Sequence, residues 1–427
     1  MKRKMQWVVF VAVALSLSAA TVWAGGQGEA ASGQGPKSIT VLTWNLPHYA
    51  DSINGWISEF QGANKGVTVT WVDKKGTELP TYYQTQLAAG TPPDIVDIQG
   101  ALWYQYAKDG IFMDLSPYFQ KDADMKTRFE PNILKAASMY QGKYYMVPFY
   151  TPSTVLFYNK PMFKAAGITS PPTTMEELVA DAKKLTHGNV SGFITLNFDW
   201  LYWPLFRANG VEILNSDGTK AAFNTPAAVQ TLKTLTQLTS SGVISKVSWT
   251  GRWVEPNGEF GAGNAAMLNA HLPALKAFES QSTWANDQTV GVAPFPGKWS
   301  VPNYHGFGIA SKSKFPDVAW NFVKLITNEK WAKNAASVLG TLSGNSAADT
   351  SLISDPQFAK DNPVVAESFK VDLSEAGNLT GITGTAKDAQ VKDAVYSNIQ
   401  KALFGQVSAE KALSDAEAAV NQILAGQ

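Results

Sequence analysis

Two strand-like runs meet at a proline near residue 152, and this junction constrains the fold more than any other part of the chain. The run Tyr144–Tyr150 is rich in the aromatic and β-branched residues that favour strands. Pro152 then interrupts the pattern, because proline has no N–H to offer a central sheet ladder. A second apolar run, Thr154–Tyr158, follows without the helix that a parallel crossover within one sheet needs. The junction is therefore either a kinked hairpin or a step between two sheets, and a step would leave two lobes with a ligand cleft between them.

The residues on both sides of this junction occur in an order that is typical of one protein family. A strand ending in VPF (residues 147–149) precedes a strand ending in YNK (residues 158–160), and a helix ending in AAGI (residues 165–168) comes next. This order closely resembles the family 1 extracellular solute-binding proteins of ABC transporters, of which the maltose-binding type is the best known. The resemblance covers residues 38–425.

The resemblance implies an α/β fold of the periplasmic-binding-protein-like, class II type. Two α/β lobes would be joined by a multi-strand hinge, with the ligand cleft between them. The length of 427 residues agrees with this, because a single hydrophobic core rarely grows so large. We expect residues 38–151 with residues 304–328 to form lobe 1, and residues 152–303 with residues 329–427 to form lobe 2.

The N-terminus has the layout of an export signal. Basic residues at positions 2–4 precede an apolar run over residues 7–17 and a small-residue segment that ends at Ala24. This layout predicts a cleaved signal peptide over residues 1–24 and a flexible Gly/Ser/Ala-rich tether over residues 25–37. The alternative is an uncleaved membrane anchor, which the serines and small residues at the end of the run disfavour.

Cysteine usage and charge narrow the location and the class of ligand. The chain has no cysteine, which excludes a disulfide framework, a zinc–thiolate site and a lipobox cysteine. We therefore expect a soluble periplasmic protein. The 35 basic and 35 acidic side chains give no reason to expect nucleic acid or an anionic membrane as a partner. Arginine occurs only four times, and this disfavours anionic ligands because arginine usually captures phosphate and carboxylate groups.

Strand and helix patterns alternate through the first lobe. Strands are expected over residues 38–44, 67–72 and 94–98, and helices over residues 52–60 and 82–89. This alternation predicts an open α/β sheet that is mixed or parallel. Ligands of such sheets bind beyond the carboxyl ends of the strands. The rule selects Trp44 and Asn45 after the first strand, and Gln99 after the third.

The second half of the chain is expected to return once to the first lobe. Helices are predicted over residues 175–186, 226–240 and 316–327, the first of them preceded by a capping box of Thr173 and Glu176. The segment NYHGFGIAS (residues 303–311) matches the family's return to lobe 1. A third crossing near residues 328–331 would place the later helices on lobe 2.

The resemblance also implies cleft residues by their position in the chain. They are Gln99 and Trp103 after the third strand, Tyr150 and Thr151 at the junction, Asp199 and Trp200 before a W-P-L sequence, Asn269 and His271 at a strand end, and Thr341 and Ser343 in a later loop. The chain lacks the carboxylate that the maltose type has at the junction, and it lacks the acidic and basic pair after the third strand. The resemblance therefore does not imply the same ligand geometry.

A polar–aromatic loop around Trp253 provides the remaining candidates. Sugar rings have apolar C–H faces that stack on aromatic rings, and sugar hydroxyls need polar partners. We expect Trp253 to form a stacking wall, with Arg252 or Glu255 binding hydroxyls. The alternative is a surface loop that packs Trp253 on its own lobe.

No motif points to a metal, a cofactor or a catalytic centre. The four histidines, His48, His187, His271 and His305, are scattered without the spacing of metal ligands. A glycosidase needs a pair of carboxylates across its cleft, and no spacing in the chain recommends a pair. A G-x-S-x-G elbow is also absent from the sequence. We expect no catalytic residue, no metal and no cofactor, and hence a protein that is not an enzyme.

The predicted function is capture of a neutral sugar, either a mono- or an oligosaccharide, by hinge closure. The closed form would deliver the sugar to the membrane permease subunits of an ABC importer. We expect a monomer in the periplasm that does not bind nucleic acid. Two alternatives stay open: a binding protein for another polar solute such as a polyol or a polyamine, and a secreted carbohydrate-active enzyme.

Overall fold

The computed structural model describes residues 36–44, 46–75, 78–99, 102–152, 154–297, 299–301, 303–375 and 387–426. The predicted signal peptide, most of the predicted tether and Asn45 lie outside the described residues. Contacts within the chain group Lys37–Gln427 as one unit. None of the helices that the structure describes has both the length and the apolar character that crossing a membrane requires.

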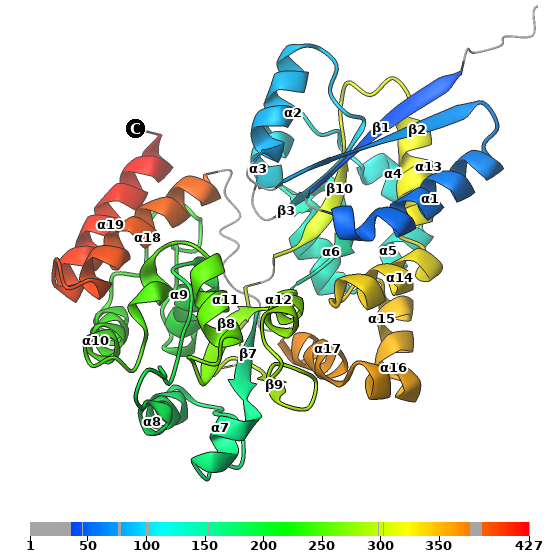
Figure 1. The fold of residues 1–427 in the computed structure, drawn as a ribbon. Coiled ribbons are helices and arrows are strands. Elements are labelled where there is room, and N and C mark those ends of the chain that lie inside the picture. Colours follow the sequence, from blue (N-terminus) through cyan, green and yellow to red (C-terminus); the bar gives the residue numbers. More distant parts are fainter. Residues whose placement is uncertain are drawn as a thin grey trace, which may run out of the picture. The chain divides into compact units, whose positions relative to one another are not determined.

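The strands of the larger sheet come from distant parts of the chain. In the described residues this sheet has the order β2-β1-β3-β10-β6 (Figure 1). Its strands are β1 (Lys37–Trp44), β2 (Val67–Lys74), β3 (Ile95–Gln99), β6 (Met146–Tyr150) and β10 (His305–Ile309). β1 pairs in parallel with β2 and β3, whereas β10 runs antiparallel between β3 and β6. The chain therefore completes this sheet only after it has built the elements between β6 and β10.

A smaller sheet follows the proline junction directly. It has the order β8-β7-β9 in the described residues, and β7 pairs antiparallel with both neighbours. Its strands are β7 (Thr154–Asn159), β8 (Met267–His271) and β9 (Val290–Ala293). Because β6 and β7 belong to different sheets, the junction is a step between sheets and the hairpin alternative is wrong.

Helices cover both faces of the larger sheet. Alternate strand residues face opposite sides, so Val41 belongs to an apolar cluster with α1 and α13, whereas Leu42 belongs to another with α2 and α3. Figure 1 shows these two pairs of helices on opposite sides of the strands. The elements around the sheet are a 3-10 turn (Pro47–Tyr49), α1 (Ala50–Ala63), α2 (Leu79–Ala88), α3 (Leu102–Lys108), α4 (Ser116–Lys121), α5 (Asp124–Thr127), α6 (Pro131–Ser138), the hairpin β4 (Met139–Tyr140) and β5 (Lys143–Tyr144), and α13 (Pro316–Ile326).

Other helices enclose the smaller sheet. They are α7 (Lys160–Ala165), α8 (Met175–Leu185), α9 (Asp199–Ala208), α10 (Pro226–Ser240), a 3-10 turn (Lys246–Trp249), α11 (Val254–Gly261), α12 (Ala274–Gln281), α17 (Pro363–Glu375), α18 (Asp388–Leu403) and α19 (Ala409–Ala425). The last two pack side by side as a hairpin of helices (Figure 1). Two sheets that both carry helices confirm the predicted α/β class.

The helix α14 (Glu329–Leu339) packs with the larger sheet, although residues 329–427 were predicted to belong to lobe 2. Its Trp331 ring meets the Trp56 ring of α1 edge-on with centroids 6.4 Å apart, and Trp331 Nε1 donates to Glu59. The apolar face of α14 thus continues the aromatic core around Trp56. α15 (Ser346–Ile353) and α16 (Pro356–Asp361) then lead to α17, which packs on β9. The other predicted lobe boundaries stay predictions.

The helix α8 begins at Met175 as predicted, but its capping box lies one residue later than predicted. Thr174 Oγ1 accepts from the Glu177 N–H at 3.1 Å, and the Glu177 carboxylate accepts from the Thr174 N–H at 3.2 Å. This reciprocal pair is a capping box, and the predicted Thr173–Glu176 pairing is wrong.

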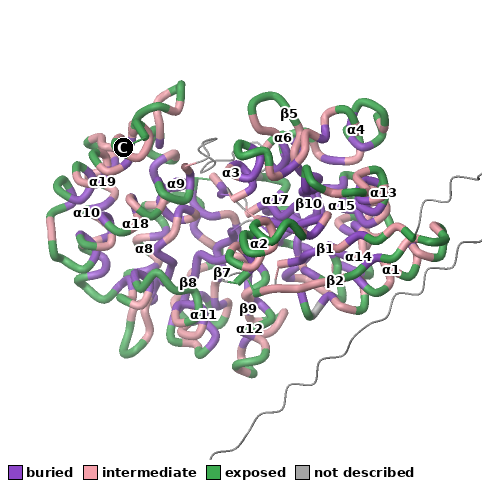
Figure 2. Tube along the Cα trace, turned by 90° about the horizontal axis from the view of Figure 1, so that it is seen from above, coloured by how far each residue is buried: buried purple, intermediate pink, exposed green. Residues whose placement is uncertain are grey.

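Figure 2 shows the strands of both sheets mostly as buried, with exposed residues on the outer helices.

Glycine in β10 is needed for close packing inside the larger sheet. A Cβ at Gly306 would lie 2.8 Å from the Val147 carbonyl oxygen and 2.7 Å from Met146 Cε. We expect Gly306→Ala to destabilise the protein by about 1–3 kcal/mol, because a buried strand backbone cannot move aside freely. The matched control is Gly62→Ala in α1, where a Cβ meets nothing within 4 Å. That change should be neutral or stabilising by about 0.5–1 kcal/mol. Urea unfolding measures both, and equal effects of the two substitutions would contradict the packing argument.

Candidate ligand-binding site

A cavity of about 700 Å³ lies where both sheets present strand ends. This volume falls within the range of small-molecule sites in proteins. The described residues that line the cavity are Trp44, Leu46, Lys75, Gln99, Tyr150, Pro152, Trp200, Trp253, His271, Pro273, Asn303, His305, Leu339 and Thr341.

Neighbouring strands of the larger sheet supply one wall. Trp44, Gln99 and Tyr150 are the last residues of β1, β3 and β6. β10 runs in the opposite direction, so it contributes its first residue, His305, which pairs in register with both Gln99 and Tyr150. The sheet topology therefore gathers residues that are far apart in sequence along one edge, as expected for ligand sites of open α/β sheets.

A buried carboxylate organises this wall. Asp97 Oδ1 lies 3.0 Å from His305 Nδ1, and Asp97 Oδ2 accepts from the Trp44 N–H at 3.2 Å. Asp97 has no exposed surface, and His305 is only 4% exposed. Asp97 thus ties the end of β1 to the start of β10.

Aromatic rings pack around His305. Its ring stacks on Tyr150 with centroids 4.0 Å apart, and Trp44 meets it edge-on at 6.2 Å. Burial raises the pKa of the Tyr150 hydroxyl well above its usual range, and the nearby Asp97 and Asp73 carboxylates add to the shift. The Tyr150 hydroxyl is therefore neutral at physiological pH and can donate a hydrogen bond. Next to this stack, Asn303 Nδ2 donates to Gln99 Oε1 at 2.9 Å.

The smaller sheet and α9 supply the opposite wall. Trp200 on α9 meets His271 at the end of β8 edge-on, with ring centroids 4.2 Å apart. Asn269 Nδ2 donates to the Trp200 carbonyl at 3.3 Å and so holds the first turn of α9 against β8. Trp200 Nε1 is buried and has no hydrogen-bond partner among the described residues. The indole N–H can therefore serve a ligand oxygen.

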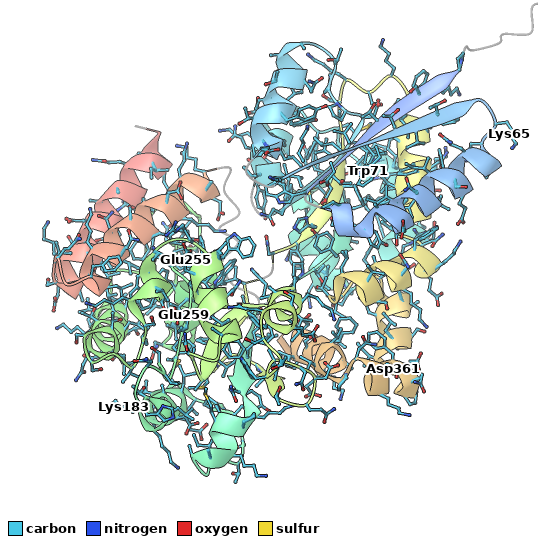
Figure 3. All side chains as sticks on the ribbon, in the orientation of Figure 1. Lys65, Trp71, Lys183, Glu255, Glu259 and Asp361 are labelled. Atoms are coloured by element: carbon cyan, nitrogen blue, oxygen red, sulfur yellow. The ribbon has the colours of Figure 1, made fainter. Side chains whose placement is uncertain are left out.

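Trp253 stands at the mouth of the cavity. It is 59% exposed and immediately precedes α11, the helix on which Figure 3 labels Glu255 and Glu259. Arg252 Nη2 forms an ion pair of 2.7 Å with Glu255 Oε1 in the first turn of this helix. Trp253 lines the cavity, whereas Arg252 and Glu255 do not.

The loop after α14 closes the cavity from a third side. Gly340 ends α14 with a positive φ of 68°, and Thr341 follows at the cavity wall. The buried Thr341 hydroxyl has no partner among the described residues, so it too is available to a ligand. Thr151 donates from both its N–H and its hydroxyl to the Leu342 carbonyl, which joins this loop to the proline junction.

Several predicted site residues have structural contacts instead of a place in the cavity wall. Trp103 is buried in the core and stacks on Tyr104 at 4.0 Å. Thr151, Asn269 and Ser343 are buried and hydrogen-bonded beside the cavity. The predicted residues that do line it are Trp44, Gln99, Tyr150, Trp200, Trp253, His271 and Thr341. Their roles in ligand binding stay predictions.

The Asp199 carboxylate forms a buried ion pair. It lies 2.6 Å from Lys392 Nζ on α18, and Lys392 also lies 2.9 Å from Asp388. Burial alone would lower the pKa of Lys392, but the two carboxylates raise it above its usual range. The Asp199 N–H donates to Tyr396 on the same helix. These contacts anchor the first turn of α9, and with it Trp200, to α18.

Half of the described residues in the cavity wall were not predicted from the sequence. The additional residues are Leu46, Lys75, Pro152, Pro273, Asn303, His305 and Leu339. Asn303 and His305 lie in the segment that resembles the family's return to lobe 1, and the strand-end rule selects only residues at carboxyl ends. Because β10 is antiparallel, its amino end lies at the ligand edge. Among the described residues no cluster of three histidine or acidic side chains could hold a metal ion.

A family comparison is consistent with this geometry. Residues 47–333 match the model of the bacterial extracellular solute-binding proteins, and the chain belongs to this family. Its members are binding proteins that work outside the cytoplasm.

Individual relatives extend over most of the chain. Diacetylchitobiose-binding protein DasA of Streptomyces coelicolor is 25% identical over 375 residues, which are 82% of this chain and 84% of that protein. A binding protein of Brucella abortus is 26% identical over 363 residues, 78% of this chain and 86% of its own length.

Solved structures show the same fold. The substrate-binding protein Lmo0181 of Listeria monocytogenes in complex with cycloalternan has a TM-score of 0.78 at 24% identity, covering 91% of this chain and 99% of that one. The maltose/maltodextrin-binding domain MalE of Bdellovibrio bacteriovorus bound to maltotriose has a TM-score of 0.72 at 22% identity, covering 91% of this chain and 100% of that one. The predicted periplasmic-binding-protein-like fold is confirmed.

Stability should depend on pH through Asp349, which holds the Thr341 loop. Burial raises the pKa of Asp349 to about 6, opposed by hydrogen bonds from Ser343 and Gly344. Between pH 4 and 6 the folded state then binds more protons than the unfolded state, so this group's stabilisation is present below pH 4 and lost as pH rises through 6. Relative to Asp349→Asn, which cannot ionise, the wild type should lose at most about 3 kcal/mol over this range. Urea unfolding at several pH values measures the difference. If the difference in unfolding free energy between the two proteins does not change with pH, Asp349 has the same pKa in the folded and unfolded states and the prediction is wrong.

Proposed function

We propose that this protein captures a neutral carbohydrate in the cavity and delivers it to the membrane permease subunits of an ABC importer. The observation that carries the proposal is the composition of the cavity wall. Aromatic rings from both walls lie there beside polar groups, and no carboxylate side chain is among the described residues that line the cavity.

The aromatic residues suit the apolar faces of sugar rings. Trp44 and the stacked Tyr150–His305 pair lie on one side, and Trp200 and Trp253 lie on the other. Rings of this kind stack on C–H faces, while hydroxyls bind to neighbouring polar groups. Buried polar atoms that lack partners among the described residues, such as Trp200 Nε1 and Thr341 Oγ1, are available for those hydroxyls.

The charge of the wall argues against ionic ligands. A polyamine would need several carboxylates, and the nearby acids are occupied: Asp97 by His305 and Asp199 by Lys392. The described lining residues include one lysine, Lys75, but no arginine, the residue that usually binds phosphate and carboxylate groups. The same lack of carboxylates argues against a glycosidase, which needs an acid/base pair at the scissile bond.

The ligands named for relatives support a carbohydrate. Diacetylchitobiose, cycloalternan and maltotriose appear in the descriptions of three of them, and tagatose appears in that of a Thermotoga lettingae protein whose TM-score is 0.76 at 21% identity. These range from a monosaccharide to oligosaccharides, so the proposal covers both sizes. A polyol remains the alternative ligand, because it offers the same hydroxyls with less ring surface to stack.

Capture would proceed by closure of the two walls on the ligand. Ligand contacts to both sheets exist together only when the walls approach, and this differential contact shifts the population toward the closed form. Delivery to a permease, a periplasmic location after removal of residues 1–24, and action as a monomer belong to the same proposal.

A sugar panel tests the proposal directly. Isothermal titration calorimetry against maltose, maltotriose, N,N′-diacetylchitobiose, tagatose, sorbitol and spermidine should detect saturable binding of a sugar without turnover. Thermal unfolding should shift upward in parallel, because a ligand that binds only the folded state stabilises it by mass action. Binding of spermidine alone, or release of reducing ends from the oligosaccharides, would overturn the proposal.

Replacement of Trp200 by alanine should weaken sugar binding. Trp200→Ala is expected to cost about 1–3 kcal/mol of binding free energy toward the sugar that binds in the panel, the scale seen for buried aromatic anchors. The matched control is Trp299→Ala, because Trp299 packs against Arg207 at 4.6 Å and does not line the cavity. Equal affinities of the wild type and Trp200→Ala would show that Trp200 does not contribute to sugar binding.

A further inference from the structure

The contact between Asp97 and His305 at the cavity wall has a chemical consequence beyond its structural role. Both side chains are buried, and they come from adjacent antiparallel strands of the larger sheet. His305 lines the cavity, whereas Asp97 lies behind it. A buried carboxylate is costly unless hydrogen bonds satisfy it, and here the Trp44 N–H and His305 Nδ1 do so.

This contact fixes where the imidazole proton resides. An ionised carboxylate only accepts hydrogen bonds. At 3.0 Å from Asp97 Oδ1, Nδ1 must therefore carry the hydrogen. In a neutral ring the other nitrogen, Nε2, then has a lone pair and accepts. Among the residues that the structure describes, Nε2 has no hydrogen-bond partner.

The surroundings of His305 hold the ring in one orientation. Tyr150 of β6 stacks on one face of the ring, and Trp44 of β1 meets its edge. Other ionisable groups nearby are Lys75 and His271, which line the same cavity, and Asp73, which accepts from the Leu46 N–H and the Thr43 hydroxyl.

We propose that Asp97 positions His305 as the neutral Nδ1–H tautomer, so that Nε2 acts as a hydrogen-bond acceptor for a ligand hydroxyl. His305 is then a specificity-determining residue and Asp97 a positioning residue. This inference rests on the proposed function and deepens it. The preferred ligand carries an O–H donor that faces the larger sheet, and replacing that hydroxyl by a methyl ether leaves Nε2 without its partner. Sites that are built to bind a hydroxyl reject such analogues strongly.

Replacement of Asp97 by asparagine should exchange the donor and acceptor roles of the two His305 ring nitrogens. In Asp97→Asn the amide oxygen can still accept from the Trp44 N–H, which leaves the NH₂ group to face His305 Nδ1. That group donates, so Nδ1 must accept and the ring proton moves to Nε2. The variant keeps the shape of the side chain but turns Nε2 from an acceptor into a donor.

Nuclear magnetic resonance of histidine-labelled protein tests the tautomer without any ligand. Two-bond nitrogen–proton correlations distinguish Nδ1–H, Nε2–H and doubly protonated rings, and loss of a signal in His305→Asn assigns it. We expect Nδ1–H in the wild type at neutral pH and Nε2–H in Asp97→Asn. Nε2–H or a doubly protonated ring in the wild type would overturn the inference, whatever the ligand is.

Calorimetry tests the ligand contact with maltotriose and N,N′-diacetylchitobiose as probes. His305→Asn keeps a polar atom near the Nδ1 position but removes Nε2, and it should weaken binding about tenfold or more. His305→Gln, whose longer side chain reaches toward the Nε2 position, should restore part of the loss. The control His187→Asn changes an exposed histidine outside the cavity and should bind like the wild type.

The outcomes separate this inference from the proposed function. A probe that binds the wild type and His305→Asn equally overturns the role of His305 but leaves carbohydrate capture intact. A wild type that binds neither the probes nor any other sugar overturns the proposed function, and the ligand contact of Nε2 with it.

Discussion

The antiparallel insertion of β10 between β3 and β6 is the pairing on which the rest of the structure depends. Its backbone hydrogen bonds join a segment near residue 305 to strands that end near residues 99 and 150. Without it β6 would have no neighbour in the larger sheet, and an unpaired strand beside a core is costly because its polar backbone groups lose water. The same pairing aligns His305 with Gln99 and Tyr150. One non-local contact thus completes both a hydrophobic core and a cavity wall.

Much of the fold follows from local sequence, because strands and capped helices leave short-range patterns. The strand ends at Trp44, Gln99 and Tyr150 could be predicted, since each apolar run stops where the cavity begins. His305 could not be predicted from the same rule. Its strand runs the other way, and direction within a sheet is set by tertiary pairing, not by the residues of the strand. The glycines of β10 were visible in the sequence, but the close approach of Val147 that requires Gly306 was not.

The predicted site was least accurate where a polar side chain has a distant partner. Asp199 lies beside Trp200 in the chain, and sequence alone does not distinguish a ligand-binding carboxylate from a structural one. Its partner Lys392 is on α18 and becomes a neighbour only when the helices pack. The α14 helix differs for a similar reason, because Trp331 finds its contacts on α1, not on the elements next to it in sequence. Such long-range contacts leave no periodic pattern in the sequence.

The absence of carboxylates from the described cavity wall results from these distant partners, not from a lack of acids in the chain. Asp97, Asp73 and Asp199 all lie close to cavity residues, yet Asp97 and Asp73 accept hydrogen bonds from the protein's own groups and Asp199 is paired with Lys392. A cationic ligand would have to compete for carboxylates that are already satisfied, and breaking a buried pair costs more than the new contact returns. The bonds that hold the strand ends and α9 in place therefore also exclude cations. The proposed selection against cationic ligands therefore follows from how the protein satisfies its own buried charges.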